Sequence, residues 1–475
     1  MSDTVRGGGS AQASRRRRNI RTPDLDTVYS INEDGSRNFL HPADVSGRWQ
    51  VLKNLVWLVL ILVYVALPWL QIGGHPAVAI DLPGRHAYLF GMSFTNQDFY
   101  LMFFVITGIG FALFVVTALW GRIWCGYACP QTVFMEGVFR KIERWIEGPR
   151  LERIRRNAGP WTADKIRRKV LKHAVFLLGS AAIAHVFLSY FIPPRELIHA
   201  IAAGPATHPV AFGWTLFWTG VLYFDYSWFR EQTCLIICPY GRLQSSLIDE
   251  DTIIIGYDER RGEPRHKGVD EGGDCVDCFR CVMVCPTGID IRNGLQMECI
   301  GCANCIDACD AVMDRIGKPR GLVRYDSQRA FRGEPRRSLL RPRVFVYIFL
   351  GLLGLTVAGL AVHSREHFQA NLLRARGLPY QVVGERLRNL YNVHLQNKSD
   401  SPDVFRITVD TGAHAGLTAI IPQPVVRLPA LADGQYPVFL EMDRADYHGP
   451  VKLWLTVTDS LHAESHRLEM TFRGP

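Results

Sequence analysis

The sequence predicts a multi-domain α-helical membrane protein with five transmembrane helices, an inserted cysteine-rich domain and a C-terminal all-β domain. Three observations lead to this fold class: five long apolar stretches, eight closely spaced cysteines between the fourth and fifth stretch, and short alternating apolar runs after the fifth. Apolar residues make up 48% of the 475-residue chain although its net charge is +9, and the excess is concentrated in those few stretches. Such concentration is typical of a membrane protein.

Each apolar stretch has about the 20 residues that a helix needs to cross the hydrocarbon layer of a membrane. The five predicted helices cover about Leu52–Ile72, Phe99–Trp120, Ala174–Ile192, Val210–Phe229 and Val344–Val362. Tryptophans lie near several of their ends, where interfacial anchors are expected. Five such stretches argue against the alternative, which is a set of buried helices in a large soluble domain.

The basic residues predict the orientation in the membrane. The link 121–173 carries thirteen lysines and arginines, whereas the links after the first and third stretches carry only Arg85 and Arg195. Cytoplasmic links are enriched in Lys and Arg, so the N-terminus and the link 121–173 are expected in the cytoplasm. Five crossings then place the C-terminal domain in the periplasm of a Gram-negative cell, with the chain in the inner membrane. The run Arg15–Arg18 fits a cytoplasmic topology anchor better than a nucleic-acid-binding tail.

The cysteine-rich stretch lies between the fourth and fifth predicted helices. It contains the spacing C-x2-C-x2-C-x3-C twice, as CVDCFRCVMVCP and CIGCANCIDACD. This is the run of bacterial ferredoxins, in which the fourth cysteine of each run ligates the other cluster. We therefore predict a 2[4Fe-4S] ferredoxin-like domain. One cluster takes Cys275, Cys278, Cys281 and Cys309, and the other takes Cys285, Cys299, Cys302 and Cys305.

A zinc module or a disulfide knot is the alternative interpretation of these eight cysteines. Zinc sites usually have well-separated C-x2-C pairs or added histidines, and the stretch 275–309 contains no histidine. Free thiolates also suit a reducing compartment, which agrees with the predicted cytoplasmic side.

The remaining cysteines, Cys125, Cys129, Cys234 and Cys238, form two C-x3-C-P motifs. Each motif lies just past the expected cytoplasmic end of a predicted helix, and we call them the four membrane-edge cysteines. A spacing of four places both thiols on one helical face, and the following proline favours a helix end. Thiolates are soft ligands for Cu(I), zinc or iron–sulfur, and can also shuttle electrons as disulfides. Buried apolar cysteines are the alternative.

Three arginines flank the two motifs, namely Arg122, Arg230 and Arg242. A nearby positive charge favours a thiolate over a thiol, so we expect these arginines to lower the pKa values of the four membrane-edge cysteines.

After Val362, short runs such as VFRITVD and VKLWLTVTD alternate between apolar and polar residues and are separated by Pro, Gly, Asp and Asn. This pattern predicts a small all-β sandwich of Ig-like type that lacks a disulfide. The expected domains are a flexible cytoplasmic tail (1–47), a four-helix membrane region (48–240), the ferredoxin-like domain (241–342), the fifth helix (343–363) and the periplasmic β domain (364–475).

The segments WCGYACPQTVF and REQTCLIICPYGRLQS, the tandem motif ending in CIDACD, and the tail beginning near LRNLYNVHLQNKSD resemble the FixG/CcoG (RdxA) family. Its members are cytochrome c oxidase accessory proteins, membrane-bound polyferredoxins of proteobacteria. The resemblance covers about residues 41–475. One departure from the bacterial ferredoxin pattern is Asp310, where proline often follows the last cysteine.

The resemblance implies a role in assembling the cbb-type cytochrome c oxidase, through reduction of Cu(II) to Cu(I) for its copper centre. Copper is then the substrate, and the four membrane-edge cysteines are the expected catalytic and copper-binding residues of a cupric reductase. The implied partners are membrane lipid, oxidase subunits or copper-handling assembly factors, and a cytoplasmic electron donor. No nucleic-acid-binding module accompanies the basic charge, so nucleic acid is not an expected partner.

Two other functions remain open from the residues themselves. The chain is alternatively a transmembrane electron conduit to a quinone, a thiol or a periplasmic acceptor, or a non-redox scaffold that delivers copper. Four further residues attract attention: His185 and Asp225 lie within predicted membrane helices, and His363 and His367 follow the fifth helix. Ionisable groups inside a membrane are often functional. A hydrogen bond within the helix bundle explains the first pair, and a linker position explains the second.

Overall fold

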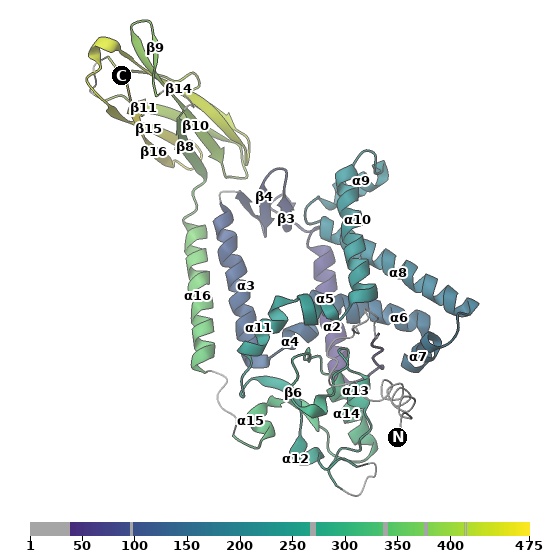
Figure 1. The fold of residues 1–475 in the computed structure, drawn as a ribbon. Helices are drawn as coiled ribbons and strands as arrows, with labels where there is room; N and C mark the ends of the chain where they lie inside the picture. The colour runs from purple at the N-terminus through teal and green to yellow at the C-terminus, as the bar shows by residue number, and fades with distance from the viewer. Residues whose placement is uncertain are drawn as a thin grey trace, which may run out of the picture. The chain divides into compact units, whose positions relative to one another are not determined.

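A computed structural model describes residues 39–95, 98–266, 272–335, 341–374, 379–412, 414 and 416–475. Most of the predicted N-terminal tail lies outside these residues. The chain forms two compact units (Figure 1). The first comprises the described residues up to Leu70 and Val105–Leu355, and the second comprises Gln71–Phe104 and Thr356–Pro475.

All five apolar stretches form helices, and the chain is a membrane protein. Among the described residues, four helices are long and apolar enough to cross a membrane: α2 (Arg48–Ala66), α3 (Phe99–Trp120), α8 (Ala163–Leu188) and α16 (Pro342–His363). The fourth stretch forms α10 (Pro209–Phe224), which continues directly into the π-helix η3 (Asp225–Phe229). A short helix, α9 (Pro194–Ala203), precedes it.

Helix α8 begins eleven residues before the apolar stretch from which it was predicted. Its N-terminus is fixed by Thr162, whose Oγ1 accepts a hydrogen bond from the backbone N–H of Lys165 at 3.3 Å. An N-cap of this kind stabilises a helix start regardless of hydropathy. The apolar pattern therefore indicated the part of the helix suited to the membrane and missed its polar first turns.

The basic link 121–173 folds into a series of short helices before α8 begins. It forms α4 (Ile123–Tyr127), α5 (Pro130–Phe134), the π-helix η2 (Met135–Phe139), α6 (Arg140–Glu147) and α7 (Arg150–Ala158). Several of its charged side chains are buried in ion pairs, including those of Arg140, Glu143 and Arg153. Part of the positive charge of this link is thus neutralised by ion pairs inside the protein.

The cysteine-rich region lies within the first unit. Its frame is a two-stranded antiparallel sheet of β6 (Ile253–Tyr257) and β7 (Val323–Ser327), and α14 (Asn304–Arg315) packs against it. The short elements of this region and its approach are η4 (Thr233–Ile237), α11 (Pro239–Leu247), α12 (Glu259–Gly262), α13 (Arg280–Met283), η5 (Ile291–Asn293) and α15 (Gln328–Phe331). Six of the eight ferredoxin cysteines pack in its apolar core.

This region docks on the first membrane helix. The carboxylate of Asp307, in α14, accepts hydrogen bonds from the backbone N–H groups of Trp49 at 3.3 Å and Gln50 at 2.8 Å. Those two N–H groups belong to the first turn of α2, where no earlier turn of helix can satisfy them. The start of α2 is therefore fixed by a residue more than 250 positions away along the chain.

The second unit contains the predicted Ig-like sandwich, and every pairing in it is antiparallel. One sheet has the order β12 (Thr418–Ile420), β14 (Asp433–Asp443), β10 (Arg386–Asn397) and β8 (Phe368–Arg374), with β9 (Gln381–Val383) also paired to β10. The other has the order β13 (Val425–Leu428), β11 (Asp403–Asp410), β15 (Val451–Asp459) and β16 (Ser465–Phe472). A short 3-10 turn, η6, covers Arg444–Asp446. Buried residues of both sheets form one core.

The second unit also contains strands that the sequence did not predict. Between the first two membrane helices lie a hairpin of β1 (Gln71–Ile72) and β2 (His75–Pro76), and a sheet of β3 (Val78–Asp81), β4 (His86–Leu89) and β5 (Met92–Thr95). The buried Asp98 follows them and forms ion pairs with Arg365 at 2.8 Å and Lys398 at 3.3 Å. These contacts join the small sheet to the β domain within the second unit.

Candidate functional site

The two C-x3-C-P motifs fold in the same way. Cys125 lies in α4 and Cys234 in η4, whereas Cys129 and Cys238 are extended residues that precede the first prolines of α5 and α11. In each motif the N–H of the second cysteine donates to the carbonyl oxygen five residues earlier, at 2.9 Å in both cases. The proline after each motif explains why the second cysteine is extended and not helical, because a proline disfavours helical geometry at the residue before it.

Side-chain contacts hold the two motifs against each other. The Sγ atom of Cys125 lies 3.4 Å from Nε2 of Gln244, in the helix that follows the second motif. The guanidinium of Arg122 donates to the carbonyl oxygen of Gly241, and Nε2 of Gln131 donates to that of Arg230 at 3.1 Å. The structure therefore brings the four membrane-edge cysteines together, although about 100 residues separate the motifs in the chain.

Burial dominates the protonation of three of these thiols. It raises the pKa of Cys125 to about 11, and it also raises the pKa of Cys129 and of Cys234. Arg122 lowers the pKa of Cys125 as expected, but burial outweighs this effect. The guanidinium of Arg230 is instead engaged by Glu143. Burial therefore favours the neutral thiol form of these three cysteines, and a bound metal ion would favour their thiolate form.

The eight ferredoxin cysteines lie in two runs with matching backbones. Asp277 and Phe279 have φ values of 48° and 57°, and the equivalent Gly301 and Ala303 have φ values of 67° and 60°. In both runs a short helix starts directly afterwards, α13 in the first and α14 in the second. Alternation of this kind turns successive N–H groups toward one point, an arrangement that suits iron–sulfur sites. The runs thus fit the two [4Fe-4S] clusters predicted.

The last cysteine of each run lies beside the other run. Burial raises the pKa of Cys309 to about 12, and the nearby charges of Cys278 and Cys275 raise it further. Burial likewise raises the pKa of Cys299 to about 12, and Cys285 is the cysteine that adds most to this rise. This placement agrees with the exchange of fourth ligands expected from the spacing, and the assignment of each ligand stays a prediction.

The first C-x3-C-P motif contacts the second ferredoxin run through Gly126. A Cβ atom added to Gly126 would lie 2.9 Å from the Cα and N atoms of Cys302 and 2.8 Å from the carbonyl oxygen of Ile300. The hydroxyl of Tyr325 donates to the carbonyl oxygen of Gly301 at 2.7 Å and holds this loop in place. In the sequence, the glycine between Cys125 and Cys129 is the one sign of this contact.

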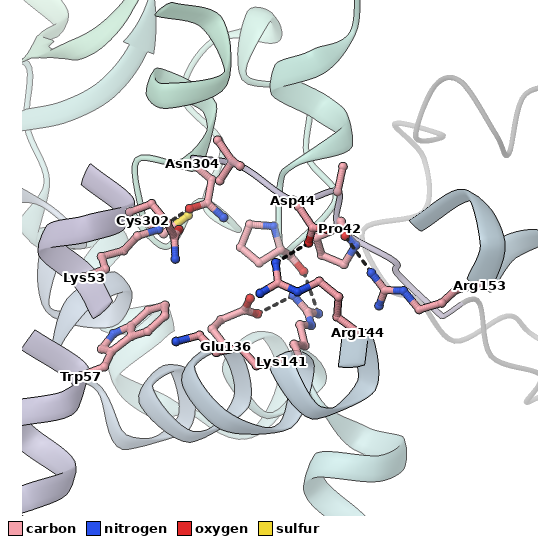
Figure 2. A pocket seen from close by; sticks show the side chains of 15 residues that line it. Pro42, Asp44, Lys53, Trp57, Glu136, Lys141, Arg144, Arg153, Cys302 and Asn304 are labelled. Carbon is pink, nitrogen blue, oxygen red and sulfur yellow. Dashed lines mark hydrogen bonds and ion pairs between the residues drawn. The ribbon is translucent and has the colours of Figure 1, made fainter. Parts of the chain in front are cut away.

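A pocket opens beside the same run, and Cys302 is one of its lining residues (Figure 2). Its wall includes Lys53, which donates to the side chain of Asn304, and Glu136, which pairs with Arg140. Arg140 also donates to the carbonyl oxygen of Pro286 at 3.2 Å. Charged side chains from α2, η2 and α6 therefore surround the second ferredoxin run.

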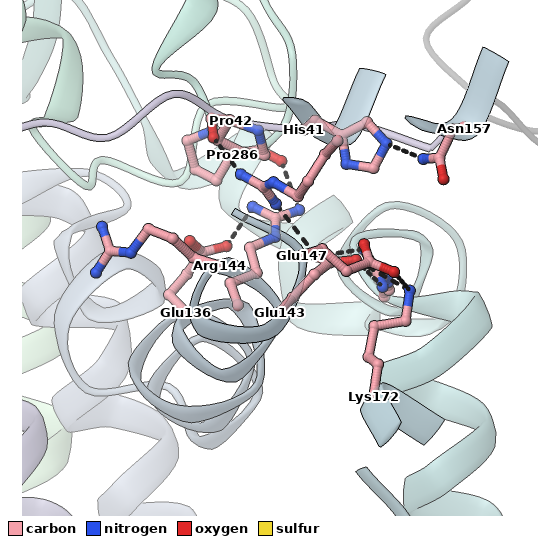
Figure 3. Close-up of polar contacts among 12 residues, drawn as sticks. His41, Pro42, Glu136, Glu143, Arg144, Glu147, Asn157, Lys172 and Pro286 are labelled. Carbon is pink, nitrogen blue, oxygen red and sulfur yellow. Dashed lines mark hydrogen bonds and ion pairs between the residues drawn. The ribbon is translucent and has the colours of Figure 1, made fainter. Parts of the chain in front are cut away.

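A network of buried ion pairs continues from this pocket (Figure 3). Glu143 is at its centre, with its carboxylate 3.1 Å from Arg230, 3.4 Å from Arg153 and 3.5 Å from Lys172. Burial by itself would raise the pKa of Glu143, but these cations hold it well below its usual range. The network ties the link 121–173 to the segment just before the second C-x3-C-P motif.

The other residues singled out in the sequence have ordinary contacts. His185 Nδ1 lies 2.7 Å from the carbonyl oxygen of Ala181 in its own helix, and Asp225 accepts a hydrogen bond from Thr233. His367 Nδ1 lies 2.8 Å from the carboxylate of Glu464. These contacts suit structural roles.

Three family models match the chain. A "4Fe-4S binding domain" model matches residues 101–149, a "4Fe-4S dicluster domain" model matches 229–328, and a model for the "IG-like fold at C-terminal of FixG" matches 358–475. The chain therefore carries iron–sulfur domains followed by an Ig-like fold.

Three curated relatives cover most of the chain. It is 34% identical to "Nitrogen fixation protein FixG" of Rhizobium meliloti, over 93% of this chain and 91% of that protein. It is 38% identical to "Protein RdxA" of Cereibacter sphaeroides, over 79% and 83%, and 37% identical to "Protein RdxB" of the same organism, over 86% and 89%. The chain belongs to the family of FixG and RdxA.

Proposed function

We propose that this chain is a membrane-bound iron–sulfur electron-transfer protein that reduces Cu(II) to Cu(I) during assembly of a cbb-type cytochrome c oxidase. The observation that carries the proposal is the contact between the two cysteine sets. Backbone atoms of Cys302 lie 2.9 Å from where a Cβ of Gly126 would be, so the second ferredoxin run and the first C-x3-C-P motif are neighbours. Such closeness suits the passage of single electrons from one set to the other.

The electron balance is simple. Each Cu(II) ion takes up one electron and becomes Cu(I), and a reduced one-electron carrier in the cytoplasm is oxidised by one electron. When bound, the two [4Fe-4S] clusters supply stepwise one-electron storage between that donor and copper. Cys125, Cys129, Cys234 and Cys238 form the exit, and their soft sulfur atoms favour the reduced copper product.

The orientation is part of the proposal. The basic residues of the link 121–173 support a cytoplasmic position for the cysteine-rich region, and an odd number of crossings gives a periplasmic β domain. Oxidase subunits or copper-handling assembly factors are the proposed protein partners, and membrane lipid surrounds the apolar helices. The exposed apolar side chains of α2, α3 and α16 support that last contact.

Copper reduction tests the proposal. Full-length protein in detergent is reduced with dithionite, desalted anaerobically and mixed with Cu(II) and a Cu(I)-specific chelator. Replacement of the four membrane-edge cysteines by alanine, singly and together, should lower the rate of Cu(I) formation at least tenfold for the quadruple variant. Ser245→Ala, on the exposed side of α11, is the matched control.

An unchanged rate in the quadruple variant shows that the proposed exit is wrong. Parent protein with intact clusters but no copper turnover contradicts copper reduction itself, and favours either the conduit to another acceptor or the copper-delivery scaffold.

A further inference from the structure

We infer that the pocket beside the second ferredoxin run binds one phosphate group, carried either by inorganic phosphate or by the headgroup of an anionic phospholipid. The pocket is lined by residues of α2, η2, α6, α7 and the second ferredoxin run (Figure 2). Nothing in the proposed reduction of copper requires such a ligand, so the inference goes beyond the proposed function. Three features of the pocket carry it, namely its charge, its unpaired hydrogen-bond donors and its size.

Positive charge predominates on the wall of this pocket. Two carboxylates line it, those of Asp44 and Glu136, together with five cations. The cations are Lys53, Arg140, Lys141, Arg144 and Arg153. An excess of cations around a cavity selects an anion, and arginine and lysine are the side chains that commonly bind phosphate groups in proteins.

Lys53 is the buried cation of this wall that lacks an opposite charge. It is only 1% exposed, and its ammonium donates to the side-chain oxygen of Asn304, which is a neutral group. Among the described residues, each of the three arginines of the wall forms an ion pair with a carboxylate, whereas Lys53 forms none. Buried charges in proteins are normally paired. A bound anion would supply the partner that Lys53 lacks.

The unpaired hydrogen-bonding atoms of the pocket wall are all donors. Nε1 of Trp57 and the Nε atoms of Arg140 and Arg153 are buried without a hydrogen-bond partner. No buried acceptor of the lining side chains, all of which belong to the described residues, is left unpaired in the same way. Buried donors cost free energy unless an acceptor satisfies them. A wall that lacks only acceptors fits a phosphate group, which offers three strong acceptor oxygens.

The size of the pocket fits one group of this kind. Its volume of about 80 Å³ is several times the roughly 10–15 Å³ that one water molecule needs, so a tetrahedral oxyanion can enter. Helix α2 lines the pocket with Gln50, Lys53 and Trp57, and it is also long and apolar enough to cross a membrane. A lipid headgroup is therefore a source of phosphate to be tested beside free phosphate.

Titration calorimetry with inorganic phosphate tests the inference without any measurement of copper reduction. Full-length protein, purified anaerobically in detergent and exchanged into a chloride-free buffer, should bind one phosphate per chain. Lys53→Met removes the ammonium and should weaken binding by about tenfold or more, as expected for one hydrogen bond to a charged group. Trp57→Phe removes the indole N–H and should also weaken binding. Arg167→Met is the matched control and should bind like the parent, because Arg167 is an exposed cation of α8 that does not line the pocket.

A second titration distinguishes the two sources of the phosphate group. Dihexanoyl-phosphatidylglycerol, a short-chain anionic lipid, is added to the protein in detergent, both alone and in the presence of phosphate. Binding of this lipid that displaces phosphate and is weakened by Lys53→Met identifies a headgroup site. Phosphate binding that the lipid leaves unchanged identifies a site for free phosphate. Either result supports the inference.

Parent protein that binds neither phosphate nor the lipid overturns the inference. Equal binding by the parent and both pocket variants overturns it as well, because the anion then binds elsewhere on the protein. Iron analysis shows whether each variant keeps its ferredoxin-like region, and Trp57→Phe decides the test if Lys53→Met loses iron. Phosphate binding by a parent protein that reduces no copper would leave the inference standing and contradict the proposed function. Copper reduction by a parent that binds neither ligand would do the reverse.

Discussion

Glu143 shows how single residues organise the cytoplasm-facing part proposed for the first unit. Its side chain is only 2% exposed, and three cations surround its carboxylate. A buried ion pair adds little net stability when complete, but removal of one partner leaves the others uncompensated. Glu143 is therefore a stronger test of the fold than the many exposed ion pairs of the same link.

We expect Glu143→Gln to destabilise the first unit by about 3–5 kcal/mol, because Arg230 and Arg153 would lose their buried counter-charge. The midpoint of thermal unfolding in detergent, followed by tryptophan fluorescence, measures the effect. Glu152→Gln is the matched control, since Glu152 is exposed on the neighbouring helix α7. Equal midpoints for the two variants would show that the buried network does not hold the link in place.

At the scale of elements, α4 is the helix through which the two cysteine sets meet. It is five residues long and carries Cys125 and Gly126 at consecutive positions. Cys125 contributes a thiol, and Gly126 packs against the ferredoxin loop at Cys302. Only glycine permits this approach, because the atoms that a Cβ would meet are backbone atoms, which cannot rotate away.

Gly126→Ala should therefore push away the loop at Cys302 and remove about four iron atoms per chain, the content of one cube. Iron analysis and the electron paramagnetic resonance spectrum of the reduced protein would report the loss. Gly220→Ala in α10 is the control, because no atom lies within 4 Å of the added Cβ there. If Gly126→Ala keeps the iron content of the control, the two cysteine sets are not packed as closely as the structure shows.

Element positions were predicted unevenly from the sequence. The strands β11 and β15 were predicted from VFRITVD and VKLWLTVTD. One face of each strand is buried, so apolar and polar side chains alternate along the sequence. The strands β3, β4 and β5 were missed, since each is four residues long and none shows a regular alternation of buried and exposed side chains. Strands this short give too few residues for a period of two to be recognised.

At the scale of the whole molecule, the distribution of basic residues leads to a prediction about topology. Alkaline phosphatase is active only outside the cytoplasm, so a fusion after Gly474 should be active and a fusion after Glu152 should not. The reason is the thirteen basic residues of the link 121–173, which are retained on the cytoplasmic side. The opposite activities would invert the proposed orientation and place the ferredoxin-like region outside the cytoplasm.

The sequence by itself determined the parts that depend on local spacing. The double ferredoxin run and the two C-x3-C-P motifs are defined by cysteine spacings of a few residues, and each specifies its own set of ligands. Each apolar stretch likewise specifies its own helix. The Ig-like fold also followed from local alternation and agrees with the family model over residues 358–475.

Only the tertiary structure decided which cysteines meet and how they are charged. The pairing of Cys125 with the segment around Gln244 spans 119 residues, and the contact of Gly126 with Cys302 depends on the packing of α4 against a distant loop. The raised pKa of Cys125 has the same origin, since burial is a property of the fold and outweighs the arginines visible beside the motif. Spacing along the chain specifies ligands, but distance and burial between segments specify the site that they form.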